Sequence, residues 1–280
     1  MKILISADST CDLGPVLTRR YDVRIMPLYV NKGGKMFRDG VDIQPNDLYA
    51  HVANGGDLCS TAAANVADYL DFFTELRKEA DAVIHLCISA HFSSTYQNAC
   101  IAAQEVDGVY VVDSRNLSTG HGHLVLMAAD AVKAGGEPEA IAAQLRKDTD
   151  KVRASFVLEQ LAYMRKGGRC STVAALGANL LNLKPSIRVT DGAMAVAKKY
   201  RGNMEKCIRQ YVNDELADLE AIRPDRVFIT HSGVTDMILQ AAQQEVEKRH
   251  YFKEILITHA GCTVCSHCGP GTLGVLYVMK

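Results

Sequence analysis

The sequence predicts an α/β fold with two domains, and two features of the chain carry that prediction. In the first half, short apolar runs rich in β-branched residues alternate with longer helical patterns, which is typical of a sheet covered by helices. From Arg153 onward, hairpin signals are mixed with helices, which favours an α+β arrangement. We therefore predict an N-terminal α/β domain over residues 1–150 and a C-terminal α+β domain over residues 151–280.

The strands of the N-terminal domain are predicted from short apolar runs that end at turn residues. Asn31-Lys32-Gly33-Gly34 marks a turn between one strand and a short strand near Met36. In chain order, the predicted strands are residues 3–7, 23–30, a short segment near 36, 82–89 and 108–113.

The helices of this domain are predicted from their start and stop signals. Pro45 suits the start of a helix that Asn54-Gly55-Gly56 ends, and Asn65 is expected to cap the next helix. The predicted helices are residues 45–53, 65–79, 95–105, 120–134 and 138–148.

The C-terminal domain combines a hairpin with helices and further strands. Asp191-Gly192 is a strong hairpin signal, Gly167 is expected to end a short helix, and Ser171 to cap a helix that Pro185 closes. The other predicted elements are strands 154–158, 187–190, 193–199, 227–230, 255–258 and 272–278, and helices 204–219 and 235–248.

The charge balance argues against nucleic acid as a partner. The chain carries 31 Lys and Arg against 32 Asp and Glu, a formal net charge of -1. Nonspecific binding to nucleic acid depends on excess positive charge that neutralises phosphates. We therefore expect no nucleic-acid partner.

The apolar runs predict a cytoplasmic protein without a membrane span. The first run is too short for a signal peptide and ends at Asp8. No run approaches the roughly 20 apolar residues that a bilayer-spanning helix needs. The nine cysteines are accordingly expected to be reduced thiols.

Residues 164–171 (Met-Arg-Lys-Gly-Gly-Arg-Cys-Ser) place three positive charges and a glycine pair beside an almost uncharged run, 172–183. Glycine lets the backbone approach a ligand closely, and an Arg guanidinium donates two hydrogen bonds to a carboxylate or phosphate. The segment therefore suits a ligand with an anionic head and an apolar tail. For Arg169, the alternative is a solvated cation near a helix C-terminus.

Clusters of small polar residues lie beside predicted strands and helices. They are Asp8-Ser9-Thr10-Cys11-Asp12, Cys59-Ser60-Thr61 and the segment from Ser89 to Tyr96. Ligands of α/β sheets collect at the carboxyl ends of strands, and helix N-termini attract anions. The second and third clusters both fall at connections between a strand and a helix, and we expect their hydroxyls to point at one crevice. Turn formation and helix capping remain the alternatives, because Asp and Ser serve in both.

An acyl hydrolase or transferase that acts alone, in the manner of a serine hydrolase, is one alternative function. It would use Ser93 with a histidine such as His91 or His267 as base. The chain has no Gly-x-Ser-x-Gly elbow, and nothing in the sequence ties either histidine to a nucleophile. Glycine-rich phosphate loops are absent too, so ATP and NAD are not expected to bind to this chain.

A metal or redox centre is the other alternative. Cys262, Cys265 and Cys268 keep the two-residue spacing of an iron–sulfur run, but threonine stands at position 272, where the fourth ligand is expected. His259 or His267 would have to complete a mononuclear site. Small cysteines in a glycine-rich turn are more often packing residues.

Six segments, taken in order along the whole chain, carry a family resemblance. They are Asp8-Ser9-Thr10-Cys11-Asp12-Leu13, Ser89 to Gln97, Val112-Asp113-Ser114, Lys166-Gly167-Gly168-Arg169, Leu180 to Pro185, and His267-Cys268-Gly269-Pro270-Gly271. In this order they resemble the DegV family, the fatty-acid-binding proteins of bacteria.

The resemblance implies two α/β domains with a long-chain fatty acid bound between them, such as palmitate, stearate or oleate. Some members of the family are the acyl-carrying subunit of fatty acid kinase, in which a separate ATP-binding protein phosphorylates the bound acid. The resemblance therefore implies a lipid-binding subunit that is not an enzyme on its own, with a kinase as partner and no cofactor or metal.

The resemblance also implies roles for single residues. Ser93 matches the serine that hydrogen-bonds the carboxylate, and Ser60 and Thr61 fall at the family's hydroxyl segment. Arg169 matches the arginine beside the head group, and His267 matches the histidine of the His-x-Gly-Pro-Gly turn. Three further residues are expected to support the anion site: Ser94, Gly168 and Gly269.

This chain departs from the family's pattern at three places. Ser60-Thr61-Ala62 stands where the family usually has Ser-Gln-Pro, Ser94 where it has Gly, and Cys268 where it has Thr. The missing proline bears on the pose of Ser60 and Thr61.

Overall fold

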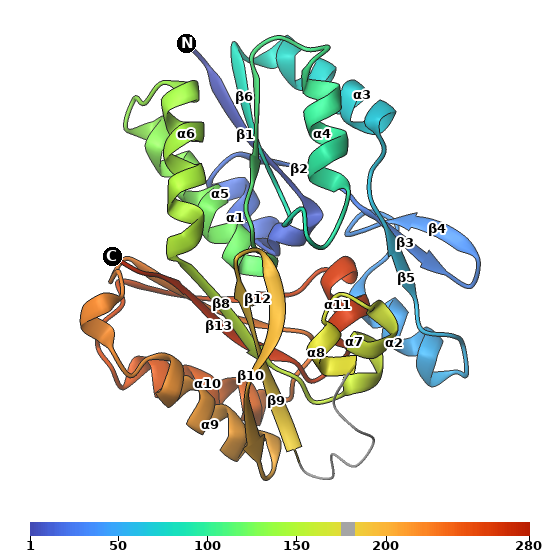
Figure 1. The fold of residues 1–280 in the computed structure, drawn as a ribbon, viewed down its shortest axis with the longest axis vertical. Helices are drawn as coiled ribbons and strands as arrows, with labels where there is room; N and C mark the ends of the chain where they lie inside the picture. The colour runs from blue at the N-terminus through green and yellow to red at the C-terminus, as the bar shows by residue number, and fades with distance from the viewer. Residues whose placement is uncertain (175–182) are drawn as a thin grey trace.

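The computed structural model describes residues 1–174 and 183–280 of the 280-residue chain. Within these residues the strands form three sheets, of which the first is parallel and lies in the N-terminal half (Figure 1). Its strand order is β2-β1-β6-β7. The bounds are β1 Ile3–Asp8, β2 Val23–Met26, β6 Ala82–Cys87 and β7 Val109–Asp113.

Helices cover both faces of this parallel sheet, as the alternating sequence pattern predicts (Figure 1). On one face, α3 (Val66–Glu79) and α4 (Thr95–Ala103) share a core with β2, β6 and β7. On the other face lie α5 (Ser118–Lys133) and α6 (Pro138–Asp148). Asn65 caps α3 as expected, because its side chain accepts from the backbone N–H of Asp68 at 2.9 Å.

The second sheet is mixed and occupies the C-terminal half in the order β10-β9-β8-β13-β11-β12. Asp191 and Gly192 join β9 to β10 with φ values of 51° and 80°, which is the hairpin that their sequence predicts. Two helices, α9 (Met204–Glu215) and α10 (Asp236–Glu247), pack on one face of this sheet. The strand bounds are β8 Val152–Val157, β9 Leu183–Thr190, β10 Ala193–Arg201, β11 Arg226–His231, β12 Glu254–His259 and β13 Leu273–Val278.

Helix α5 lies between the two sheets and is buried over residues 118–126. Two of its glycines permit the close approach. A Cβ on Gly122 would lie 2.7 Å from the carbonyl oxygen of Cys11, and one on Gly120 would lie 2.9 Å from Cβ of Ala154 in the second sheet. The apolar core is therefore continuous across both halves of the chain.

A small antiparallel sheet and several short helices complete the fold beside this core. The sheet has the order β4-β3-β5. Helix α11 packs against α7, α2 and β5, which brings distant parts of the chain together. The bounds of these elements are β3 Tyr29–Lys32, β4 Lys35–Arg38, β5 Ser60–Ala62, α1 Gly14–Arg20, α2 Pro45–Ala53, α7 Leu161–Gly167, α8 Ser171–Ala174 and α11 Cys262–Cys268.

Some predicted elements differ from the observed ones. The single strand expected over 23–30 is divided at Pro27, which has no backbone N–H to donate. Pro185 was expected to close a helix, but it lies inside β9, near the start of the strand, where proline is tolerated. Residues 175–182 of that predicted helix lie outside the described residues.

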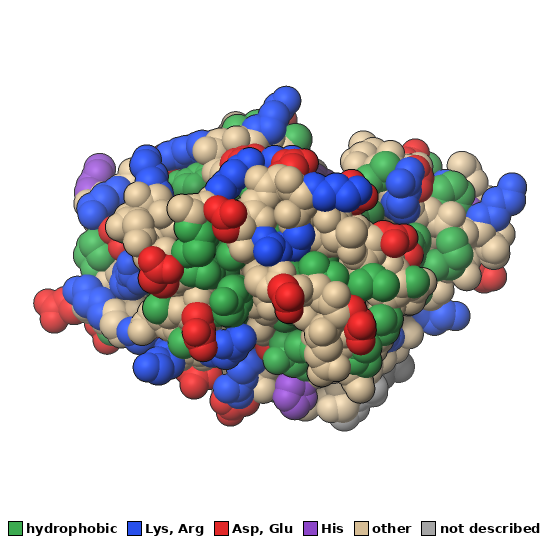
Figure 2. Space-filling model, turned by 90° about the horizontal axis from the view of Figure 1, so that it is seen from above, with side chains coloured by type: hydrophobic (Ala, Val, Ile, Leu, Met, Phe, Trp, Pro, Cys, Tyr) green, Lys and Arg blue, Asp and Glu red, His purple; other side chains and the backbone are tan. Residues whose placement is uncertain are grey.

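The surface agrees with the near-neutral composition. In the view from above, acidic and basic side chains are interspersed (Figure 2). Among the described helices, none combines the length and the apolar character that crossing a bilayer requires.

Candidate functional site

A small hollow lies where β5, the connection from β6 to α4, the segment after α7, and α11 meet. Its free volume is about 60 Å³. Polar side chains form part of its wall: Thr61, Ser93, Arg169, Thr263 and His267. Most of the remaining wall is apolar and includes Leu28, Ile88, Phe92, Leu117, Met164, Met194 and Val264. The hollow therefore combines a polar group with an apolar lining, as an amphiphilic ligand requires.

Four predicted site residues, far apart in sequence, meet at this hollow. Thr61 comes from β5, whose backbone pairs with Val30 of β3, and Ser93 from the connection that leads into α4. Arg169 follows Gly168, whose positive φ of 68° ends α7. His267 lies near the end of α11. Two of these residues thus belong to the N-terminal half and two to the C-terminal half.

His267 links the two halves of the site. Its Nε2 lies 2.8 Å from the hydroxyl of Thr61, and this hydrogen bond connects α11 to β5. Burial and the nearby charge of Arg169 lower the pKa of His267 to about 4, so the ring is neutral at pH 7. The other ring nitrogen, Nδ1, is buried without a hydrogen-bond partner in the described part of the chain and faces Gly167, where a Cβ would overlap it.

Ser93 belongs to a pair of hydroxyls at the start of α4. Its Oγ lies 2.8 Å from Oγ1 of Thr95 and accepts from the backbone N–H of Thr95 at 3.2 Å. In the described part of the chain, no histidine hydrogen-bonds Ser93. The serine–base pair that a hydrolase would need is therefore missing from this arrangement.

Arg169 is exposed and is held by backbone carbonyls. Its Nε donates to the carbonyl of Phe92 at 3.3 Å and its Nη1 to the carbonyl of Gly167 at 2.8 Å. No carboxylate within the described ranges forms an ion pair with it. The guanidinium thus lies at the mouth of the hollow with its charge uncompensated by an acidic side chain, which suits an anionic group.

The other predicted site residues lie outside the lining of the hollow. Ser60 is exposed and pairs with Asn31 in the small sheet, and Ser94 is exposed at the N-cap position of α4 without a capping bond. Gly168 and Gly269 have φ values of 68° and 72° and shape the turns after α7 and α11. At Gly269, a Cβ would overlap the ring of Tyr163.

Sequence reasoning missed Thr263, because a glycine-rich turn was expected where α11 forms. Thr263 is 6% exposed and lines the hollow, and its hydroxyl has no hydrogen-bond partner among residues 1–174 and 183–280. The available signal was the four-residue spacing between Thr263 and His267, which places two residues on the same face of a helix.

Two buried carboxylates from the N-terminal half hold the start of α11. Asp39 accepts from the backbone N–H groups of Cys262 at 2.8 Å and Thr263 at 2.9 Å. Asp12 accepts from the N–H of Gly261 at 2.8 Å and from the hydroxyl of Ser118. These side chains satisfy N–H groups that a helix leaves unpaired at its start, so α11 is anchored across the two halves.

A second, smaller hollow lies next to the first. It has a free volume of about 20 Å³ and shares Leu117, Val264 and Cys268 with the first hollow. Phe156 and Leu276 add apolar wall on its far side. The two hollows are therefore neighbours that share part of their wall.

The three cysteines of α11 are packed as buried thiols. Cys262 donates to the carbonyl of Ile43 and Cys265 to that of Ala260, each at 3.3 Å. Burial raises the pKa of Cys268 to about 12 and also raises the pKa of the other two thiols. Within residues 1–174 and 183–280, no group of three or more His, Cys, Asp or Glu side chains is arranged to hold a metal ion.

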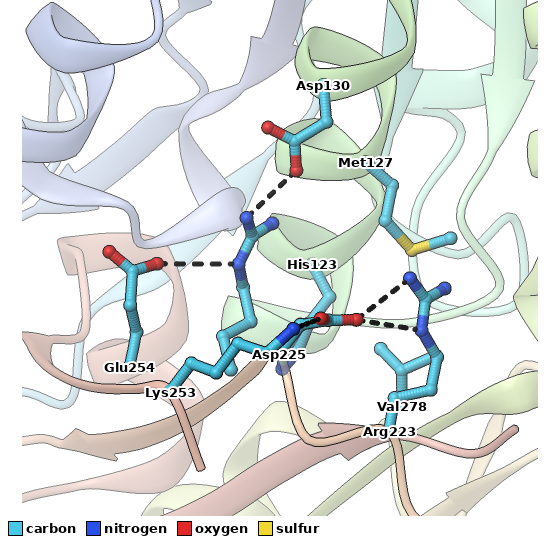
Figure 3. A pocket seen from close by; sticks show the side chains of 9 residues that line it. His123, Met127, Asp130, Arg223, Asp225, Lys253, Glu254 and Val278 are labelled. Atoms are coloured by element: carbon cyan, nitrogen blue, oxygen red, sulfur yellow. Dashed lines mark hydrogen bonds and ion pairs between the residues drawn. The ribbon is translucent and has the colours of Figure 1, made fainter.

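A larger hollow of about 390 Å³ lies elsewhere, between α5 and the second sheet (Figure 3). Its charges pair with one another. Arg226 contacts Asp130 at 2.8 Å and Glu254 at 3.9 Å, while Arg223 and Lys253 both contact Asp225. Because three basic side chains face three acidic ones, this hollow offers no excess charge to an ionic ligand.

Comparison with known proteins places the chain in a family. The profile described as "Uncharacterised protein, DegV family" matches residues 2–280. A DegV domain-containing protein of Caldanaerobacter subterraneus is 31% identical over 100% of this chain and 99% of its own length. The protein named DegV from Bacillus subtilis is 27% identical over 100% of both chains.

Solved structures show the same fold. A DegV family protein from Thermus thermophilus, whose structure is described as showing fatty acid binding, has a TM-score of 0.92 and 33% identity over 100% of both chains. DegV of Bacillus subtilis, described as a fatty acid binding protein, has a TM-score of 0.88 and 25% identity over 100% of both chains. From its full-length match to the profile and its likeness to these relatives, we conclude that this chain belongs to the DegV family.

Proposed function

We propose that this protein binds a long-chain fatty acid and presents its carboxylate to a separate ATP-binding kinase, which forms an acyl phosphate. The observation that carries the proposal is the meeting of Thr61, Ser93, Arg169 and His267 at one apolar hollow. The fatty acid binding described for the Thermus thermophilus and Bacillus subtilis relatives supports it. The protein itself supplies binding and no catalytic group.

The proposed ligand lies between two domains that join near residue 150. Thr61 and Ser93 come from the first domain, Arg169 and His267 from the second. The hydroxyls of Thr61 and Ser93 hydrogen-bond the carboxylate, which is costly to bury without polar partners. The neutral His267 contributes by holding the hydroxyl of Thr61 through its Nε2. Arg169 contacts the charged head from the mouth of the hollow and favours an acyl phosphate, which carries more negative charge.

The acyl chain supplies the affinity. Each buried methylene contributes about 0.8 kcal/mol, so palmitate, stearate or oleate gains on the order of 10 kcal/mol before the costs of binding. A free volume of about 60 Å³ is far below the roughly 300 Å³ or more of ordinary ligand pockets. Side chains must therefore move when the chain enters, and the unbranched Met164 and Met194 in the wall are suited to this.

Mass spectrometry of a denatured extract of the purified protein tests the binding step. We expect a co-purifying long-chain fatty acid and, after its removal, binding of added oleate or palmitate. Serine 93 gives the residue-level test, because S93A should weaken the binding of oleate while leaving the fold intact. A protein that neither carries nor binds a long-chain acid would contradict the proposal.

A substitution of Arg169 distinguishes the binding of the fatty acid from its presentation to the kinase. Because most of the affinity comes from the apolar chain, R169A should retain much of the oleate binding. It should strongly reduce acyl phosphate formation when a bacterial fatty acid kinase and ATP are added, since the charge beside the head group is gone. Unchanged phosphorylation of acid bound to R169A would remove this role. Lys166, an exposed cation of α7 that does not line the hollow, provides the control substitution, K166A.

A further inference from the structure

We propose that Thr263 is an additional ligand of the fatty acid head group, with its hydroxyl donating a hydrogen bond to a carboxylate oxygen. The inference rests on the proposed function and adds a residue to the same site. It concerns a side chain that is 6% exposed, lines the hollow and has an unpaired hydroxyl.

Helix α11 presents two different stripes to the hollow. Thr263 and His267 are four residues apart and so lie one above the other on the same face. Val264 and Cys268 form a neighbouring stripe, and both of these also line the second hollow. The polar stripe therefore marks the head of the ligand, and the apolar stripe marks the direction of its chain.

The unpaired hydroxyl needs an explanation, because a buried polar group without a partner destabilises a fold. Threonine at the start of a helix often uses its hydroxyl to cap a backbone N–H. Thr263 is instead the second residue of α11, after the N-cap Gly261, and Asp39 binds the N–H groups of Cys262 and Thr263, so the hydroxyl has no capping role. A ligand that accepts its hydrogen bond gives the hydroxyl the partner that the protein lacks.

The anchoring of α11 holds this hydroxyl in place before a ligand arrives. Asp39 and Asp12 bind three successive N–H groups, those of residues 261–263, and Thr61 binds His267 near the other end of the helix. With the helix fixed at both ends, the hydroxyl loses little freedom on binding.

The test compares T263V with the wild type after removal of bound lipid. Valine keeps the shape of threonine and deletes only the hydroxyl. We expect the dissociation constant for oleate to rise by about tenfold or more, the effect of losing one hydrogen bond to a charged group. We also expect the melting temperature of the lipid-free protein to stay the same or rise, because an unpaired buried hydroxyl has been removed. T263S, which keeps the hydroxyl, should restore most of the affinity.

T149V is the matched control. Thr149 is also buried, but its hydroxyl donates to the carbonyl of Arg146 at 2.9 Å. This substitution should lower the melting temperature and leave oleate binding unchanged. Wild-type affinity in T263V, or a lowered melting temperature of its lipid-free form, would overturn the assignment while leaving the proposed function standing. Failure of the wild type to bind any fatty acid would overturn both.

Discussion

His267 shows how closely the candidate site is fitted around single side chains. One ring nitrogen bonds Thr61, and the other is buried against Gly167. Alanine is a better helix former than glycine by about 1 kcal/mol, so local propensity alone would favour alanine at the end of α7. The imidazole of His267 occupies the space that a Cβ at position 167 would need. The tertiary contact therefore favours glycine at this position.

We predict that G167A weakens the binding of oleate. The new Cβ would overlap Nδ1 of His267 and push the ring away from Thr61, at an overpacking cost of about 1–3 kcal/mol. Isothermal titration with oleate measures the affinity, and the NMR signals of the His267 ring report its displacement.

The neighbouring Gly168 supplies the control for this prediction. It has φ 68°, and no atom lies within 4 Å of the position of its Cβ. G168A should therefore cost about 1–2 kcal/mol of stability through backbone strain, with the affinity for oleate retained. Equal losses of affinity in both variants would show that His267 is not the cause.

Helix α11 is an element made by contacts that are distant in sequence. Its sequence, Cys-Thr-Val-Cys-Ser-His-Cys, consists largely of residues with modest or low helix propensity. Helices this short are marginal on their own. Asp39 and Asp12 bind its first N–H groups, and α7, α2 and β5 pack around it. The helix and the site therefore form together.

We predict that D39N destabilises the protein and weakens the binding of oleate together. The amide keeps one acceptor oxygen but turns an NH2 group toward a backbone N–H of α11. A buried donor left without an acceptor costs about 1–3 kcal/mol. Urea unfolding measures the stability, and titration with oleate measures the affinity. D150N is the control, because Asp150 is exposed in its ion pair with Arg115 and should matter little. Loss of stability in D39N with wild-type affinity would show that the binding site does not depend on this contact.

The molecule as a whole is built around α5, which joins the two sheets into one core. Burial at and near this core leaves several histidines uncharged. It lowers the pKa values of His85 and His123 to about 3 and those of His231 and His267 to about 4, and it lowers that of His121. Burial also raises the pKa of Asp12 to about 8, and this shift has the opposite influence on how stability depends on pH.

We predict that the free energy of unfolding falls as the pH drops from 7 to 4. Histidines in the unfolded chain take up protons near pH 6.5, while burial holds the pKa values of these five below that value in the folded state, so acid favours unfolding. Asp12 acts in the other direction, since its raised pKa makes its contribution larger as the pH falls from 8 to 4. The five histidines together outweigh Asp12, because each titrating group changes the free energy of unfolding by up to about 1.4 kcal/mol per pH unit.

Urea unfolding at several pH values measures this dependence. H231Q should reduce the slope of the unfolding free energy against pH by up to about 1.4 kcal/mol per pH unit, the contribution of one proton. The reason is that burial and His259 hold the pKa of His231 low. H91Q, at an exposed position, should keep the wild-type slope. A stability that rises between pH 7 and pH 4 would contradict the prediction.

Local signals were sufficient for most of the helices and strands. Pro45 begins α2, Asn65 caps α3, and Asp191-Gly192 turns the hairpin, each through chemistry confined to a few neighbouring residues. The apolar pattern predicts one strand over 23–30, whereas Pro27 divides it in the structure. Helix α11 could not be predicted this way, since Asp12 and Asp39, which bind its first N–H groups, lie more than 200 residues earlier in the chain.

The amino-acid sequence was enough to predict the α/β class, the main elements and a ligand with an anionic head and an apolar tail. Periodicity, caps and turn residues act over short distances along the chain, so they predict the elements. The positive charges and glycines that predict the ligand all lie in one segment, residues 164–171. The family resemblance assigned Thr61, Ser93, Arg169 and His267 to one site, but only the folded chain shows their contacts, such as the hydrogen bond between Thr61 and His267. The exposure of Ser60 and Ser94 and the hydroxyl of Thr263, which lacks a partner among the described residues, also came only from the folded chain. The reason is physical, because burial and hydrogen-bond partners depend on which distant segments pack together.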